Sequence, residues 1–210
     1  MKLLVIGATG RTGALLITKA LDEGHEVTAL VRNAKVDIDP RVQIVQGSVT
    51  DANAIANAAT GHDAIISALG VRSISETPTL ITDMVRAVIA SSKISGVNRF
   101  VLLSAFGVGD SLAKASRIAS TLFRTMLKKV YADKANSEKL LIASDLVWTL
   151  EYPGALNDHA GKSYTATELD NVSKLPLVPA TSRASVADFL LRSAVDGTFI
   201  RQIAVVTDKK

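Results

Sequence analysis

The chain has 210 residues, of which 48% are hydrophobic and 21% charged, and a net charge of +4, so we expect one soluble domain over residues 1–210 with a single good core. It contains no cysteine, which excludes disulfides, thiol chemistry and cysteine-based metal sites. No apolar run approaches the roughly 18 residues needed to span a bilayer, and no signal-peptide pattern precedes the first strand, so we expect a cytoplasmic protein without a membrane segment.

The first thirteen residues carry the clearest pattern. An apolar run, Leu3-Leu4-Val5-Ile6, ends at Gly7-Ala8-Thr9-Gly10-Arg11-Thr12-Gly13, and a helical pattern follows over residues 14–21. Glycine permits positive φ and lets a ligand approach the main chain, while the start of a helix directs N–H groups and its positive dipole end at the same point. A strand, a glycine turn and a helix in this order predict a phosphate-binding nucleotide site.

Strands and helices alternate through the rest of the chain. We predict further strands, each rich in apolar or β-branched residues, at residues 26–31, 42–46, 63–70, 99–104, 146–151 and 201–206. Helices are predicted between them, with Thr77-Pro78 and Ser185-Val186-Ala187-Asp188 marking two of their starts. The alternation implies parallel strands joined by right-handed crossovers, and therefore an α/β fold of the Rossmann type with a doubly wound parallel sheet.

Two stretches interrupt the simple pattern. Periodicity is lost over residues 155–183, where we expect a small substrate-side lobe of loops with room for a hairpin. Basic residues gather between Lys114 and Lys139, with apolar residues at four-residue spacing among them. We interpret this second stretch as a helix with a solvated cationic face rather than a nucleic-acid-binding patch.

Ligands of a doubly wound sheet bind at the carboxyl ends of its strands. Arg32 ends the second strand about twenty residues beyond the glycine turn, where NAD-binding proteins place an acidic residue on the ribose 2′-hydroxyl. A cation there suits a 2′-phosphate, so we predict NADP(H); a plain surface arginine is the alternative. Arg72, in the loop after the fourth strand, can reach the pyrophosphate or be an exposed loop arginine.

Three polar residues are candidates for catalysis. Ser104 ends the fifth strand and could donate a hydrogen bond to a carbonyl or to the nicotinamide amide. Tyr131 and Lys134 are similar to the Tyr-x-x-x-Lys pair of short-chain dehydrogenases, although the gap is one residue short. At about 100° per residue they still share a helix side, which leaves Tyr131 as a proton donor and Lys134 as a cation near ribose or substrate. We interpret Asp133 and Glu138 as helix-surface charges.

Several of these segments together resemble a known family. They are residues 7–13, 27–32, 69–72, 104–106 (Ser-Ala-Phe) and 148–154 (Trp-Thr-Leu-Glu-Tyr-Pro-Gly). The chain is similar over nearly its whole length to the NAD(P)H-binding, NmrA-like group of atypical short-chain dehydrogenases, and within it to the NADPH-dependent flavin and biliverdin-IXβ reductases. The resemblance implies hydride transfer from NADPH to a small-molecule acceptor: a flavin, a quinone or a tetrapyrrole.

The resemblance also implies roles for individual residues. Thr9, Gly10, Arg11 and Thr12 would hold the pyrophosphate, Arg32 the 2′-phosphate, Val49 the adenine, Gly70 and Arg72 the phosphate and ribose side, and Ser104 the nicotinamide and substrate. Lys134 and Gly154 stand where the reductases have histidines. The full set assigned to the cofactor is Gly7, Thr9, Gly10, Arg11, Thr12, Gly13, Arg32, Val49, Leu69, Gly70, Arg72, Ser104, Pro153 and Gly154.

Two other functions remain open at this stage. A non-catalytic regulator of the NmrA type would bind NADP(H) as a redox signal for a partner protein. An isomerase or epimerase acting on a nucleotide-linked substrate would need a larger substrate lobe than residues 155–183 offer. We expect a monomer or small homo-oligomer without a metal, a nucleic-acid partner or a membrane partner.

Overall fold

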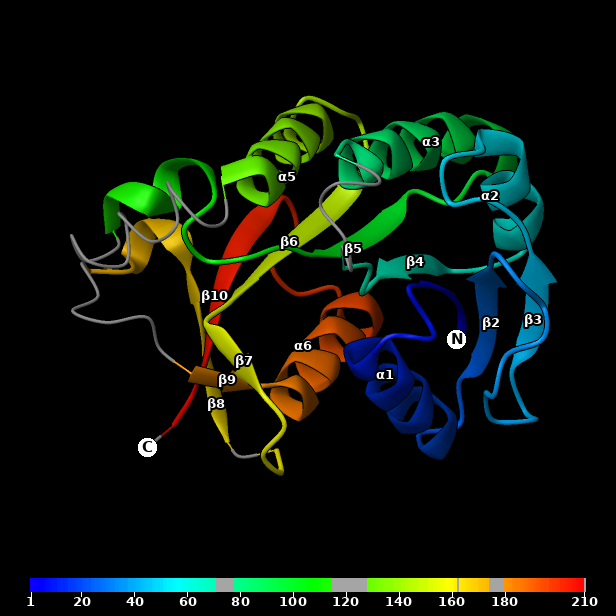
Figure 1. The fold of residues 1–210 in the computed structure, drawn as a ribbon, viewed down its shortest axis with the longest axis horizontal. Coiled ribbons are helices and arrows are strands. Elements are labelled where there is room, and N and C mark those ends of the chain that lie inside the picture. The colour runs from blue at the N-terminus through cyan, green and yellow to red at the C-terminus, as the bar shows by residue number, and fades with distance from the viewer. Residues whose placement is uncertain (71–77, 115–127, 162, 174–179, 210) are drawn as a thin grey trace.

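The computed structural model describes residues 1–70, 78–114, 128–161, 163–173 and 180–209. Within these residues an eight-stranded sheet runs through the molecule, and helices lie on both of its faces (Figure 1). The strands in spatial order are β3 (Gln43–Gln46), β2 (Glu26–Val31), β1 (Lys2–Ile6), β4 (Ala64–Ser67), β5 (Arg99–Leu103), β6 (Val147–Pro153), β10 (Gln202–Asp208) and β8 (Tyr164–Glu168).

All neighbouring strands in this sheet are parallel except β8, which pairs antiparallel with β10 at one edge. The order reverses between β1 and β4, because the chain builds outward from β1 to β3 and then crosses to the other side of β1. Such a reversal opens a crevice beyond the carboxyl ends of the two strands, where ligands of doubly wound sheets bind. The predicted Rossmann-type fold is confirmed.

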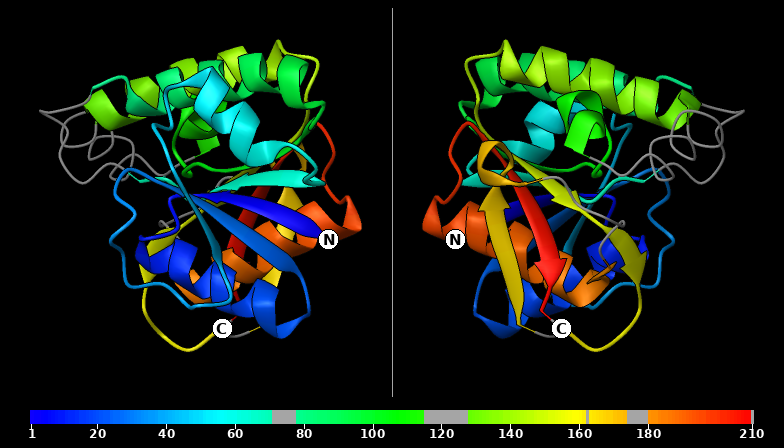
Figure 2. Two further views of the ribbon diagram at one scale, coloured as in Figure 1. Left: turned by 90° about the vertical axis from the view of Figure 1, so that its right-hand side faces the viewer. Right: turned by 90° about the vertical axis from the view of Figure 1, so that its left-hand side faces the viewer.

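The helices form two layers, which the side views in Figure 2 separate clearly. One layer contains α1 (Arg11–Asp22) and α6 (Arg183–Asp196), and the other contains α2 (Ala52–Ala59), α3 (Leu80–Ser95) and α5 (Lys128–Ile142). Two 3₁₀ turns, η1 (Gly109–Lys114) and η2 (Leu169–Asn171), and a parallel pair, β7 (Ala155–Asn157) with β9 (Ala180–Ser182), complete the described elements.

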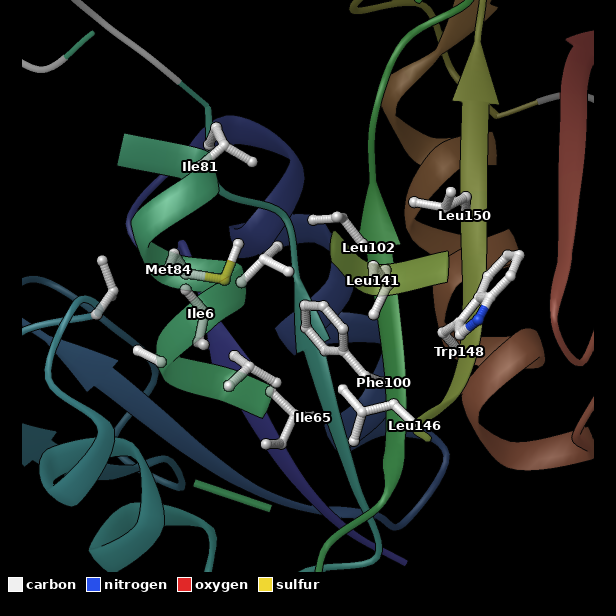
Figure 3. Packing of buried hydrophobic residues seen from close by; sticks show 14 of the residues in the cluster. Ile6, Ile65, Ile81, Met84, Phe100, Leu102, Leu141, Leu146, Trp148 and Leu150 are labelled. Carbon is white, nitrogen blue, oxygen red and sulfur yellow. The ribbon is translucent and has the colours of Figure 1, made fainter. Parts of the chain in front are cut away.

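Successive side chains of a buried strand point to opposite faces of the sheet, so the core is divided into one cluster under each helix layer. In β1, Leu4 and Ile6 belong to the cluster under α3 and α5, whereas Leu3 and Val5 belong to the cluster under α1 and α6. Figure 3 shows the first cluster, in which strand residues pack against the two helices above them. The labelled strand residues are Ile6, Ile65, Phe100, Leu102, Trp148 and Leu150, and the helix residues include Ile81, Met84 and Leu141.

Three details differ from the sequence prediction. Residues 155–183 contain no hairpin among their described residues: β8 joins the main sheet beside β10, and β7 pairs in parallel with β9. The last helix begins at Arg183, with the Ser182 side chain accepting from the Ser185 N–H, so the capping pattern starts three residues earlier than predicted. Helix α3 begins at Leu80 rather than near Pro78.

The start of α3 is stabilised from another helix. Thr79 is the N-cap residue, yet its side chain makes no capping hydrogen bond. The Asp133 carboxylate of α5 instead accepts from the N–H groups of Ile81 (2.9 Å) and Thr82 (3.0 Å). Asp133 is buried, so its interpretation as a surface charge is wrong, because α5 packs against the open end of α3. Thr77 lies outside the described residues.

Candidate functional site

The turn between β1 and α1, residues 7–13, is closely packed; we name it the nucleotide turn. Gly7 has φ +84°, and a Cβ there would lie 2.7 Å from the backbone nitrogen of Leu69. A Cβ on Gly13 would lie 2.2 Å from the carbonyl oxygen of Gly7, and the Gly10 N–H donates to that oxygen at 3.0 Å. Glycine is therefore required at positions 7 and 13 for the turn to fit between the end of β4 and the first turn of α1.

The same turn leaves the start of α1 open to a ligand. Gly10 is the N-cap residue of α1 and has no side chain with which to cap the first N–H groups. The first helical turn contains no acidic residue, so no carboxylate there neutralises the positive end of the helix dipole. An anion is the expected partner of these N–H groups.

A pocket of about 310 Å³ lies beside the nucleotide turn, at the point where the strand order reverses. Its walls come from the turn itself, from the ends of β2 and β4, and from the segment after β3. The residues predicted to bind the cofactor that line this pocket are Gly7, Thr9, Gly10, Arg32, Val49, Leu69 and Gly70. The lining residues that the sequence did not single out are Ala8, Leu30, Val31, Asn33, Val36, Ala68 and Leu80.

Arg32 is the cation among the described residues that line this pocket. It follows β2 directly, and its exposed side chain forms no ion pair within the described part of the chain. The Gln46 side-chain amide donates to the Arg32 carbonyl oxygen at 3.2 Å, which ties the segment after β2 to the end of β3. The guanidinium is thus available to an anionic ligand at the pocket rim.

The remaining predicted cofactor residues lie outside this pocket lining. Arg11 forms an ion pair with Asp158 at 2.6 Å, and Asp158 also pairs with Arg183 at 2.6 Å. These contacts join the nucleotide turn to the predicted substrate-side lobe. Thr12 is buried in the first turn of α1, and Pro153 is buried at the end of β6. The Gly154 N–H donates to Thr181 Oγ1 at 2.9 Å, and Arg72 lies outside the described residues.

Ser104 belongs to a set of buried polar groups at the carboxyl end of β5, outside the lining of this pocket. Its hydroxyl donates a hydrogen bond to Glu138 Oε1, and the Tyr152 hydroxyl donates to Glu138 Oε2 at 2.7 Å. The three side chains, which we name the buried carboxyl cluster, come from the segment after β5, from α5 and from β6. Glu138 is only 4% exposed, so its interpretation as a helix-surface charge is wrong.

The environment of Glu138 alters its ionisation. Burial raises the pKa of Glu138, because desolvation penalises the charged form. Hydrogen bonds from Ser104 and Tyr152 and the positive charge of Lys134 act in the opposite direction. The one sequence feature that sets Glu138 apart is its position one helical turn beyond Lys134, and this spacing does not show that the pair is buried.

Tyr131 and Lys134 both turn toward the chain that follows β5. The Tyr131 hydroxyl donates to the Phe106 carbonyl oxygen at 3.2 Å, and Lys134 Nζ donates to the Leu103 carbonyl oxygen at 3.4 Å. Burial raises the pKa of Tyr131 to about 12 and lowers the pKa of Lys134 to about 8. Lysine therefore does not lower the pKa of this tyrosine, as it does in the Tyr-x-x-x-Lys arrangement.

The described residues were also examined for metal sites and for membrane-spanning helices. No group of three or more histidine, aspartate or glutamate residues among them is arranged to hold a metal ion. None of the helices described here is long and apolar enough to cross a membrane. Much of the predicted basic stretch, residues 115–127, lies outside the described residues.

The strand reversal, the nucleotide turn and the adjoining pocket define a dinucleotide-binding Rossmann protein. The sequence profile of the NAD(P)H-binding family matches residues 7–196, and the chain belongs to this family. The family membership expected from the sequence is confirmed.

Individual relatives extend this assignment. The chain is 29% identical over 178 residues to the uncharacterized sugar epimerase YhfK of Bacillus subtilis, covering 81% of this chain and 79% of YhfK. The anaerobilin reductase ChuY of Escherichia coli O157:H7 has a similar structure, with a TM-score of 0.79, 25% identity, and coverage of 100% of this chain and 98% of ChuY. SP1627 of Streptococcus pneumoniae, a putative NADH-flavin reductase, shares the fold with a TM-score of 0.78, 23% identity and full coverage of both chains. Oxidoreductases that use NAD(P)H are thus among the protein's neighbours.

Proposed function

We propose that the protein is an NADPH-dependent reductase that transfers hydride to a flavin, a quinone or a linear tetrapyrrole. The observation that carries the proposal is the pocket beside the nucleotide turn, with the open start of α1 on one side and Arg32 on its rim. The first feature suits a pyrophosphate and the second suits a ribose 2′-phosphate. The similarity to ChuY supports reduction of an extended conjugated ring system.

The residues of the pocket fit a dinucleotide. Main-chain N–H groups of Arg11 and Thr12, at the uncapped start of α1, would hold the pyrophosphate, and Val49, which is largely buried in the pocket wall, would contact the adenine. Gly70 faces open space, since a Cβ there would meet no atom within 4 Å, so the wall after β4 has room for the ligand. When bound, NADPH supplies the hydride. Ser104 would orient the nicotinamide amide or a carbonyl of the acceptor.

One observation favours a second candidate, a non-catalytic NADP(H)-binding regulator. Tyr131 and Lys134 are engaged with backbone carbonyl oxygens, so neither resembles the activated acid of a short-chain dehydrogenase. A nucleotide that is sensed rather than consumed would need no such acid. Epimerase activity, as in the name of YhfK, would likewise need an acid and a base on opposite sides of a substrate.

Stopped-flow spectroscopy tests the proposal directly. NADPH absorbance would be followed after mixing the purified protein with FMN, FAD, a quinone or biliverdin, and we expect oxidation with at least one acceptor. Ser104→Ala should slow this step by roughly tenfold to a hundredfold, the loss of one oriented hydrogen bond. Ser91→Ala is the matched control, because Ser91 is an equally buried serine of α3 that bonds only its own helix, at Val88 O. Tight NADPH binding without turnover on any acceptor would favour the regulator instead.

A further inference from the structure

Glu138 is a buried carboxyl that lies outside the lining of the pocket beside the nucleotide turn, so nucleotide binding does not explain its burial. Its carboxyl is reached by Ser104 from the segment after β5 and by Tyr152 from β6. Among the described residues, Lys134, one turn earlier on α5, is the charged group whose positive charge lowers the pKa of Glu138. η1 closes the remaining side with Gly109, where a Cβ would lie 3.7 Å from Glu138 Oε2. Burying a carboxyl group costs free energy unless its oxygens are hydrogen-bonded, so the positions of the protons on these groups matter for stability.

The proton inventory of these groups allows two arrangements. As a carboxylate, Glu138 accepts hydrogen bonds from both hydroxyls, one at each oxygen. As a carboxylic acid, Glu138 must donate one of these hydrogen bonds. The hydroxyl that accepts this bond can then donate its own hydrogen to another group. Burial raises the pKa of Glu138 and favours the second form. Ser104, the hydroxyl proposed to contact the acceptor, follows the carboxyl end of β5 directly, at the edge of the sheet where ligands bind.

We propose that Glu138 supplies the proton of the reduction through the hydroxyl of Ser104, while Tyr152 holds the second carboxyl oxygen in place. This inference rests on the proposed reductase function and identifies the proton source for that same site. Glu138 acts through Ser104 and contacts neither cofactor nor acceptor, so its role is to position and deliver a proton.

Two proton transfers accompany the arrival of the hydride at the acceptor. The acceptor gains a hydride and becomes negatively charged at one atom, which takes the hydrogen of the Ser104 hydroxyl. Ser104 takes the proton of Glu138 at the same time, so the serine is unchanged and Glu138 remains as a carboxylate. The Tyr152 hydroxyl and the charge of Lys134 stabilise that carboxylate until it regains a proton from water. No protein group is oxidised or reduced.

The neighbouring candidates are less suited to this task. The Tyr131 hydroxyl donates a hydrogen bond to the Phe106 carbonyl oxygen, and burial raises the pKa of Tyr131 to about 12, far from the neutral range in which a general acid works well. Lys134 donates to the Leu103 carbonyl oxygen. Only Glu138, among the three, has its hydrogen-bond partner at Ser104.

Infrared difference spectroscopy tests the proton on Glu138 without cofactor or turnover. Protein labelled with ¹³C-glutamate would be compared with labelled Glu138→Gln across a pH titration. We expect the wild type to show carbonyl stretches of protonated carboxylic acids at neutral pH, one from Glu138 and one from the buried Glu151, and the variant to lack the Glu138 band alone. Tyr152→Phe removes a donor to the carboxylate, so the band should persist to higher pH. A Glu138 that is ionised throughout the neutral range would overturn the proposal.

The pH dependence of the first turnover tests the transfer itself. Wild-type rates should fall as pH rises through the pKa of Glu138, because only the acid form can donate. Glu138→Gln, which keeps the hydrogen-bonding shape, should be slower by about a hundredfold or more at low pH and lose this dependence. Glu138→Asp should restore part of the dependence, and Tyr152→Phe should move it to higher pH. Glu168→Gln, on β8 and outside the site, is the control for loss of a carboxylate.

The outcomes separate the two proposals. If wild-type protein binds NADPH and reduces no acceptor, the reductase function fails and the proton relay fails with it. If the wild type reduces an acceptor and Glu138→Gln keeps both its rate and its pH profile, the relay is wrong and the reductase stands. Should Glu138→Gln fail to fold, the Tyr152→Phe shift in the same profile decides, and an unshifted profile overturns the relay.

Discussion

The nucleotide turn and the buried carboxyl cluster differ in the sequence distance that separates their parts. The turn consists of seven consecutive residues; Gly13 is fixed by the Gly7 carbonyl oxygen within the turn, and Gly7 by backbone atoms that follow β4. The cluster joins Ser104 to Glu138 across 34 residues and Glu138 to Tyr152 across 14. The first site could be recognised from the sequence alone, whereas the second exists only because α5 packs against the ends of β5 and β6. A binding site built into one turn and a proton site built across three elements therefore leave very different traces in a sequence.

Gly13→Ala should have the largest effect and would break the first of these regions. The new Cβ would lie 2.2 Å from the Gly7 carbonyl oxygen, which is backbone and cannot move aside cheaply. We expect the free energy of unfolding to fall by about 3 kcal/mol or more, measured by urea denaturation. Gly70→Ala is the control, because its Cβ would meet no atom within 4 Å and stability should change little. Equal stability of the two variants would show that the turn is looser than described.

Asp133→Ala tests a tertiary contact on the same helix as Glu138. It removes the carboxylate that accepts from the N–H groups of Ile81 and Thr82, leaving two buried donors without that partner. We expect a loss of about 2 kcal/mol in the free energy of unfolding. Asp83→Ala, on the more exposed first turn of α3, should cost less than about 1 kcal/mol. A reversed order would mean that α3 does not depend on α5 for its cap.

Glu151→Gln compares two buried carboxyl groups, Glu138, which is hydrogen-bonded to two hydroxyls, and Glu151. Both Glu151 oxygens are buried and have no hydrogen-bond partner among the residues that the structure describes, and burial raises the pKa of Glu151 well above its ordinary value of 4.5. Because the unfolded state loses this proton at a lower pH than the folded state, the contribution of Glu151 to stability is fully present below pH 4.5. It is lost as the pH rises from 4.5 to the folded-state pKa. The wild type should lose up to about 1.4 kcal/mol per pH unit from this group, and Glu151→Gln should not. Exposed Glu26→Gln serves as control; a slope unchanged in Glu151→Gln would refute the assignment.

The same distinction explains how far the sequence could predict the structure. The second strand was predicted at residues 26–31 and is found there, because a β-branched apolar run between polar ends marks its own boundaries. Pairing between distant segments was not predictable in this way: β8 pairs with β10, matching Ala166 to Val206, in a segment where loops with room for a hairpin had been expected. The pocket beside the nucleotide turn is lined by seven of the fourteen residues that the sequence assigned to the cofactor. Glu138 and Asp133 were missed, since charged residues on a helix are usually solvated and only packing reveals that these are buried.

The central claim is that the pocket beside the nucleotide turn takes NADP(H) with its 2′-phosphate on Arg32. Calorimetric titration of NADPH and NADH into wild type and Arg32→Asp tests it most directly. We expect the wild type to prefer NADPH, and Arg32→Asp to lose about 1.5–3 kcal/mol of NADPH binding free energy with little change for NADH. Arg41→Ala, whose guanidinium is already held by Asp39 at 2.8 Å, should bind both nucleotides as the wild type does. An NADPH affinity unchanged in Arg32→Asp would contradict the claim.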